Sequence, residues 1–196
     1  MRLGAVVRAA LVGAALVFSS AGAAPAPGPG TLPGGGAYIV RPAGGAPVAA
    51  IALWYRAPAG GFTATATPGI GRLAAAAVAA SDPVTGTSLA HFVRAVGGRL
   101  SIAAYPESIA VSAVVPADRA ADTVKAMTRS YFAPVLTDAG LTVARQDVLE
   151  DVTIRSFNHD AALNDAIYAT LFASGPDKIP PYGSSAAFAA LSVDAI

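Results

Sequence analysis

The chain has 196 residues, enough for one domain with a hydrophobic core; 54% of them are hydrophobic and only 13% are charged. Its formal net charge is +1 and no basic cluster is visible, which argues against nucleic acid as a partner. The absence of cysteine excludes disulfides, thiolate metal sites and cysteine nucleophiles.

The N-terminus has the organisation of a secretory signal. Arg2 and Arg8 form a basic segment, residues 9–18 form an apolar run, and residues 21–23 give an A-x-A cleavage site. The apolar run is shorter than the ~20 residues that span a bilayer. We therefore expect a signal peptide over residues 1–23, export to the periplasm or beyond the cell, and no membrane span after its removal.

A linker and two strands are predicted next. Residues 24–36 are rich in proline and glycine and predict a flexible linker, so the folded domain is expected over 37–196. Within it, residues 37–41 form a short strand candidate. Residues 48–56, VAAIALWYR, form a stronger one because they are rich in β-branched and aromatic side chains.

Two helices and a hairpin follow the loop at residues 57–68. The alanine-rich stretch 69–80, GIGRLAAAAVAA, predicts a helix that packs closely against its neighbours. A second helix is expected over 87–96 and is ended by a Gly-Gly pair. Residues 99–105 and 108–115 then predict two strands joined by a tight turn.

The rest of the chain predicts helices. They are expected over residues 117–131, 138–156, 160–172 and 185–191, with Asp138 as the N-cap of the longest one. Helical spacing predicts that their buried stripes contain Val124, Met127, Tyr131, Leu141, Val148, Val152, Leu163, Ile167 and Leu171. The order of elements predicts an α+β fold, in which helices cover one face of an antiparallel sheet.

Several strings, in this order and spacing, resemble the N-terminal domain of the insulinase/pitrilysin-type zinc metallopeptidases, the family of mitochondrial processing peptidase. They are IALWYRA at 51–57, the glycine-led helix at 69–80, GGRL at 97–100, VSAVVPAD at 111–118, YFAPVLTDAGLTVARQDVLEDV at 131–152 and PYG at 181–183. The resemblance extends over nearly all of residues 37–196. It implies the same metallopeptidase-like α+β fold.

The resemblance also marks where a zinc site would lie. In active members the glycine-led helix carries H-x-x-E-H, whose two histidines bind zinc and whose glutamate is the general base. These positions correspond to Arg72, Ala75 and Ala76. A third zinc ligand falls on Asp151, a vestigial ligand position, and an assisting glutamate on Ala144. We therefore expect a catalytically inactive member with no metal or other cofactor, in which Arg72 and a buried Asp151 form an ion pair.

The peptide-binding edge also differs from the family pattern. After the Gly-Gly-x-Leu string, active members carry Asn-Ala on an edge strand that pairs with the peptide, whereas this chain has Ser101 and Ile102. Backbone pairing needs only an exposed edge. The resemblance thus implies a candidate edge strand at Leu100, Ser101, Ile102 and Ala103.

Other motifs are weaker. His91 and His159 are expected to be solvated or capping residues, and Glu150 and Asp151 to point to different sides of their helix. Gly69-Ile70-Gly71 imitates a dinucleotide motif but follows a loop and lacks the later acid. No G-x-S-x-G nucleophile motif occurs.

Three functions are compatible with the sequence. The first is an exported structural or peptide-binding partner of an active zinc peptidase subunit, in a heterodimer, or of a second homologous domain. The second is an active zinc endopeptidase, which the missing H-x-x-E-H disfavours. The third is an unrelated exported α+β binding domain. Since members of the family carry a second homologous domain, the chain is expected to be truncated at its C-terminal end.

Overall fold

The computed structural model describes residues 28–31, 36–41, 45–56, 67–81, 86–172, 174, 178, 181–189 and 191. The predicted signal peptide, residues 1–23, lies outside them. Within these ranges, none of the helices combines the length and the apolar composition that a membrane crossing requires.

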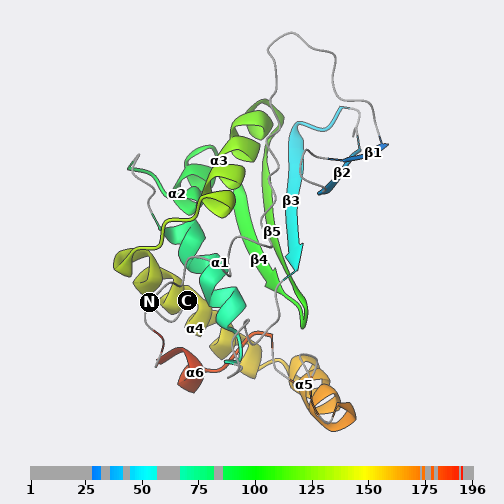
Figure 1. The fold of residues 1–196 in the computed structure, drawn as a ribbon, viewed down its shortest axis with the longest axis vertical. Coiled ribbons are helices and arrows are strands. Elements are labelled where there is room, and N and C mark those ends of the chain that lie inside the picture. Colours follow the sequence, from blue (N-terminus) through cyan, green and yellow to red (C-terminus); the bar gives the residue numbers. More distant parts are fainter. Residues whose placement is uncertain are drawn as a thin grey trace, which may run out of the picture.

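In the described residues, five strands form two antiparallel sheets (Figure 1). The smaller sheet pairs β1 (Gly28–Thr31) with β2 (Ala37–Val40). The larger one has the order β3-β5-β4, formed by β3 (Val48–Arg56), β4 (Arg99–Ala104) and β5 (Ser108–Pro116). Along the described part of the chain, β3 and β4 are therefore the two edges of the larger sheet.

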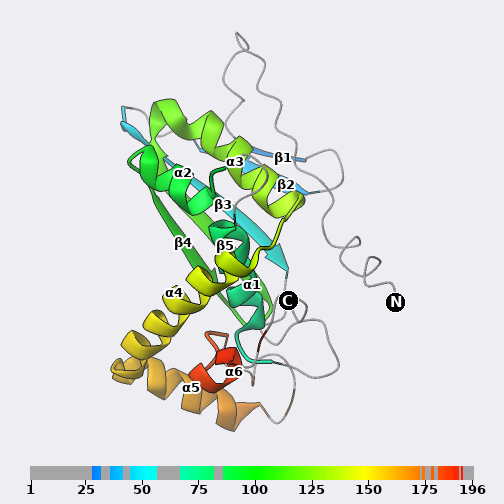
Figure 2. The ribbon, with the colours of Figure 1, turned by 90° about the vertical axis from the view of Figure 1, so that its left-hand side faces the viewer.

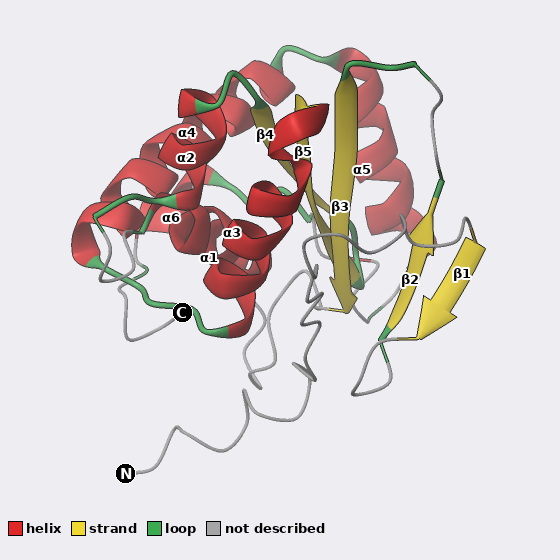
Figure 3. Cartoon of the chain, turned by 90° about the horizontal axis from the view of Figure 1, so that it is seen from above, coloured by secondary structure: helices red, strands yellow, loops and turns green. Residues whose placement is uncertain are grey.

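Six α-helices accompany the sheets in the described ranges. They are α1 (Ile70–Ala80), α2 (Leu89–Ala95), α3 (Ala120–Phe132), α4 (Asp138–Ser156), α5 (His159–Leu171) and α6 (Ser185–Ala189). Helices α1, α2 and α3 lie on one face of the larger sheet, and the β1–β2 pair lies beyond β3 on the side away from them (Figures 2 and 3). The predicted α+β fold is confirmed.

The core lies between this helical face and the sheet. Alternate residues of β5 point toward the helices because side chains alternate along a strand, and four of them are buried: Ile109, Val111, Ala113 and Val115. On the opposite face, Trp54 is 60% exposed and stacks on Tyr105, with ring centroids 5.4 Å apart. Trp54 is thus a sheet-surface residue, and the neighbouring Tyr55 packs against the core.

Helix α1 lies between two cores, which explains its alanine content. Ala75 and Ala79 belong to the cluster against the sheet, whereas Leu73 and Ala77 belong to a second cluster against α4 and α6. Small side chains on both sides let the neighbouring elements approach closely.

The folded part starts earlier than the sequence predicts. Residues 28–31, expected to be linker, form β1 and pair with β2 in the register Gly30↔Tyr38. A Cβ at Gly30 would lie against the Tyr38 ring, so glycine at this position leaves the ring room to lie across the partner strand. β2 and β3 are neighbours along the chain, but they belong to different sheets.

Two predictions about the later helices are wrong. The N-cap of α4 is Thr137, whose hydroxyl accepts a hydrogen bond from Gly140 N, and not Asp138. On α5, Leu163, Ile167 and Leu171 are 60%, 41% and 71% exposed. Helical spacing identifies residues that share a face, but it does not show whether another element lies against that face. The predicted stripes of α3 and α4 are confirmed, with Val124 and Val152 partly buried.

The buried tyrosines predict how stability depends on pH. Tyr131 donates a hydrogen bond to Ala75 O of α1 at 2.8 Å, and its ring centroid lies 6.1 Å from that of Tyr55. Burial raises the pKa of both phenols, and the charge of Tyr55 raises the pKa of Tyr131 further. Above about pH 10, these two tyrosines therefore keep their protons in the native state, whereas they ionise in the unfolded chain.

The free energy of unfolding should thus fall above about pH 10, by up to about 1.4 kcal/mol per pH unit for each tyrosine. Urea unfolding between pH 7 and about pH 11.5 measures this slope across the ordinary pKa of tyrosine. Tyr131→Phe and Tyr55→Phe should each reduce the slope, and the double variant should reduce it more. An unchanged slope in the double variant would contradict the assignment.

Candidate functional site

Arg72 lies in the first turn of α1 and points toward α4. Its side chain is only 5% exposed, and its Nη2 donates to Asp151 Oδ2 near the C-terminal end of α4. The predicted ion pair is confirmed. The expectation that Asp151 is buried is wrong, since its side chain is 56% exposed. The arginine is the buried member because α1 is covered on both sides, whereas the last turns of α4 reach solvent.

Close backbone packing brings α1 and α4 together. A Cβ at Gly140 would lie 2.7 Å from Ser81 Cα and 2.8 Å from Ser81 N, so α4 begins almost on the backbone of the end of α1. Thr137 N also donates to Ser81 Oγ at 3.1 Å. From this crossing, the two helices run past each other with Ala77 and Ala144 between them, and Asp151 reaches Arg72.

The loop before α6 completes the cluster. Tyr182 lies against two guanidinium groups, with Arg72 Cζ 5.0 Å and Arg155 Cζ 4.4 Å from its ring centroid. Arg155 also donates to Asp165 Oδ1 of α5 at 2.9 Å. This cluster of Arg72, Asp151, Tyr182, Arg155 and Asp165 is named the arginine–tyrosine cluster below. Sequence reasoning finds its first two members only.

The glycine next to Tyr182 is the sequence signal from which the place of Tyr182 in the cluster could have been predicted. Gly183 and Gly69 both have positive φ, 75° and 79°, and a Cβ at Gly69 would lie 2.6 Å from Gly183 Cα. The backbone of the loop therefore lies directly on the start of α1, which places Tyr182 near Arg72. A glycine after an aromatic residue, together with a glycine that starts a helix, is compatible with such a close approach.

The positions assigned to the zinc motif do not fit a zinc ion. A catalytic zinc needs about three protein ligands, but Ala75, Ala76 and Ala144 have no donor atom and Arg72 is a cation. Ala75 is 2% exposed and packs in the core against the sheet. In the described ranges, no three His, Cys, Asp or Glu side chains lie close enough together to hold a metal. The correspondence of these positions with H-x-x-E-H stays a prediction.

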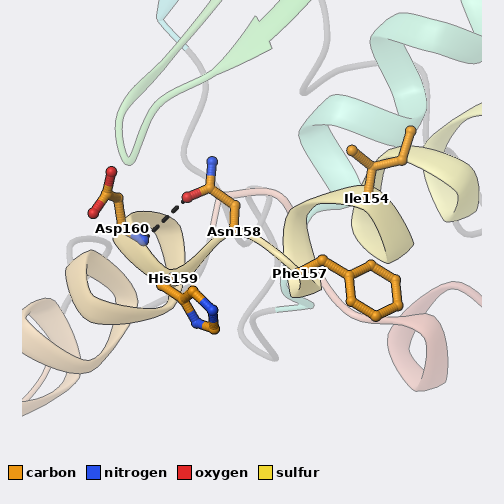
Figure 4. Close-up of a pocket in the computed structure, with 5 residues that line it drawn as sticks. All are labelled: Ile154, Phe157, Asn158, His159 and Asp160. Carbon is orange, nitrogen blue, oxygen red and sulfur yellow. Dashed lines mark hydrogen bonds between the residues drawn. The ribbon is translucent and has the colours of Figure 1, made fainter.

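The histidines lie apart from the cluster. His91 is exposed on α2, where its backbone N–H donates to the N-cap Ser88. His159 lies at the corner between α4 and α5, in a surface pocket of about 480 Å³ lined by Ile154, Phe157, Asn158, His159 and Asp160. Asn158 Oδ1 accepts from Asp160 N at 3.0 Å, and the side chains of His159 and Asp160 point away from each other (Figure 4). This pocket holds no pair of groups placed for acid–base chemistry.

The predicted peptide-binding residues lie on β4, one edge of the described sheet. Tyr105 N donates to Ser108 O at 2.8 Å and closes the hairpin with β5. Backbone groups alternate direction along an antiparallel strand. Counting back from this pair, the N–H and C=O of Leu100, Ile102 and Ala104 point to the outer edge, whereas those of Ser101 and Ala103 bond to β5.

The Arg72–Asp151 pair gives a prediction about stability. Asp151→Asn should lower the free energy of unfolding by about 1–2 kcal/mol, because it leaves the buried guanidinium without its carboxylate; solvent at the exposed Asp151 limits the loss. Arg72→Met should change it by less than about 1 kcal/mol, because an apolar side chain of similar length replaces a buried charge. Urea unfolding measures both, with Glu150→Gln on the same turn as the control. A larger loss for Arg72→Met than for Asp151→Asn would contradict this account.

Comparison with known proteins identifies the fold. No protein-family model and no curated protein sequence matches the chain. Solved structures do match. A chain of complex III2 from Candida albicans aligns with 84% of this chain at a TM-score of 0.63 and 16% identity. An M16-like peptidase from Alicyclobacillus acidocaldarius aligns with 81% at 0.62 and 13% identity.

A third match is a peptidase M16 inactive domain from Pseudomonas fluorescens, which aligns with 78% of this chain at a TM-score of 0.56 and 16% identity. The chain spans 37–38% of the length of these three solved chains. M16 is the insulinase/pitrilysin-type peptidase family. The resemblance carried by the sequence strings and the agreement of the folds point the same way: the chain has the fold of an M16 peptidase domain.

Proposed function

We propose that this chain is an exported, non-peptidase homologue of the insulinase/pitrilysin-type metallopeptidases. The observation that carries this proposal is the arginine at the predicted zinc position. Arg72 is buried and paired with Asp151, the carboxylate expected from the third ligand position. A guanidinium in that place repels a metal cation and cannot act as a ligand.

Its role in this proposal is to bind extended peptide and to form part of the chamber in which an active zinc peptidase encloses its substrate. The chain would do so either as a separate subunit or as one half of a longer chain. The outward N–H and C=O groups of Leu100, Ile102 and Ala104 would pair with the peptide by strand addition. A peptide held in this way is positioned but not cleaved.

The first test measures the mature chain, without residues 1–23. We expect no stoichiometric zinc by elemental analysis and no chelator-sensitive hydrolysis of unstructured peptides. Stoichiometric zinc together with hydrolysis that a chelator stops would overturn the proposal.

The second test measures peptide binding by fluorescence anisotropy. An extended peptide should bind, and the same peptide N-methylated at every second residue should bind at least about tenfold more weakly, because it loses the donors that strand addition uses. The peptide methylated in the other register is the control. Equal affinity for all three would contradict binding through the edge of β4.

The partner role is tested with family peptidases of the same organism that carry H-x-x-E-H, beginning with any that a neighbouring gene encodes. We expect the two purified proteins to form a 1:1 complex in sedimentation analysis. Two separate species at micromolar concentration would contradict a heterodimer.

A further inference from the structure

The arginine–tyrosine cluster contains buried hydrogen-bond donors that its own acids do not satisfy. The Nε and Nη1 atoms of Arg72 are buried and have no hydrogen-bond partner in the described part of the structure. Only its Nη2 reaches an acceptor, Asp151 Oδ2. Buried charged donors without acceptors are costly. An acceptor group is therefore favoured at this guanidinium.

A second guanidinium in the cluster, that of Arg155, also has a buried donor without a hydrogen-bond partner among the described residues. The side chain of Arg155 is 28% exposed and bonds to Asp165 through Nη2, whereas its Nε is buried and has no partner among the described residues. Both guanidiniums contact the ring of Tyr182, at 5.0 and 4.4 Å from its centroid. Two cations from α1 and α4 thus converge on one side chain of the loop.

The chemistry of these donors selects the ligand. A guanidinium N–H donates a short, charge-assisted hydrogen bond to an oxygen of a carboxylate or a phosphate, and two guanidinium groups offer several such donors. The two acids of the cluster each engage one nitrogen and are 56% and 39% exposed, so water screens their charge, whereas Arg72 is almost fully buried.

We propose that Arg72 and Arg155, held against Tyr182, form a binding site for an oxyanion, a phosphate or a carboxylate. The site lies where α1, α4 and the loop at residues 181–183 meet. Asp151, whose side chain is 56% exposed, lies on the solvent side of this site. This site and the proposed peptide-binding edge of β4 use different residues and different ligand chemistry, so either can exist without the other.

The experiment titrates the mature chain with inorganic phosphate or acetate at constant ionic strength, with chloride as the balancing anion. Thermal unfolding and calorimetry give the dissociation constant, since a ligand of the native state raises the unfolding midpoint. We expect saturable stabilisation by phosphate or acetate. The dissociation constant should rise at least about tenfold in Arg72→Met and in Arg155→Met, because each variant loses guanidinium donors of the site. It should be unchanged in Arg94→Met, the control at an exposed arginine of α2.

Two further arms make the result decisive. If Arg72→Met does not fold, Arg155→Met alone decides whether the cluster binds the anion. A short peptide with a free C-terminal carboxylate is compared with its amidated form: binding lost on amidation identifies a peptide terminus as the ligand, whereas binding of phosphate alone identifies a free anion. The absence of saturable binding, or the same dissociation constant in all variants, would overturn the proposal.

Discussion

Replacing Gly69 by alanine should lower the free energy of unfolding by about 3 kcal/mol or more, the sum of a backbone cost and an overpacking cost. Gly69 has a φ of 79°, where an L-residue costs about 1–2 kcal/mol. The added Cβ would also lie 2.6 Å from Gly183 Cα and 2.6 Å from Phe188 Cζ. The first contact is with backbone, and Phe188 is fully buried, so neither atom can move away cheaply. Overpacking of this kind costs about 1–3 kcal/mol more.

The chain offers a matched control for this prediction. Gly97 has the same φ of 79°, and a Cβ at this position would meet nothing within 4 Å. Gly97→Ala should therefore show the backbone cost alone, about 1–2 kcal/mol. Urea unfolding of both variants measures the difference. Equal losses would mean that the loop at residues 181–183 does not lie on the start of α1.

A glutamate at position 75, the predicted place of the family's general base, should destabilise the protein by more than about 3 kcal/mol at neutral pH. Ala75 is 2% exposed and lies in the core against Val93, Val111 and Met127. A longer side chain would overpack this region, and its carboxylate would lose water without gaining a partner. Burial would raise the pKa of the new carboxyl. The part of the loss due to charge should therefore disappear below about pH 4, where both states are protonated.

Ala139→Glu on the exposed first turn of α4 is the control, and it should change stability by less than about 0.5 kcal/mol. Urea unfolding at neutral pH and at about pH 3 measures both variants, because the glutamate of the unfolded chain is charged in the first condition and protonated in the second. If Ala75→Glu costs no more than Ala139→Glu, then position 75 does not face the core. The triple variant Arg72→His, Ala75→Glu, Ala76→His should show the same loss of stability. Introducing the three residues of H-x-x-E-H would therefore not by itself create an active site.

Most of the fold could be predicted because its signals are local. The hairpin pattern with a strand at 108–115 and the β-branched and aromatic run at 48–56 correctly predict β5 and β3. The stripe with Met127 and Tyr131 correctly predicts the buried face of α3. The features that could not be predicted depend on distant partners. The exposed stripe of α5 and the pairing of Gly30 with Tyr38 both depend on which element lies opposite, and periodicity carries no information about that.

The candidate site was predictable only in part. Family resemblance predicts Arg72 and Asp151 as a pair, and the structure places them in contact. Asp151 is exposed and not buried as predicted, because sequence alone does not show that α4 reaches solvent at its end. Tyr182 reaches Arg72 through the close approach of two glycines, a contact between segments more than 100 residues apart in the chain. Arg155 and Asp165 meet between the end of α4 and α5.

The stacking of Trp54 on Tyr105 provides a spectroscopic probe. Trp54 is the only tryptophan in the sequence, and the tyrosine stacked on it lies in the turn that follows β4. Because the indole is already 60% exposed, loss of the stack should change the intensity of its fluorescence more than its wavelength. The emission of the unlabelled protein thus reports on the end of the sheet edge that is proposed to receive peptide.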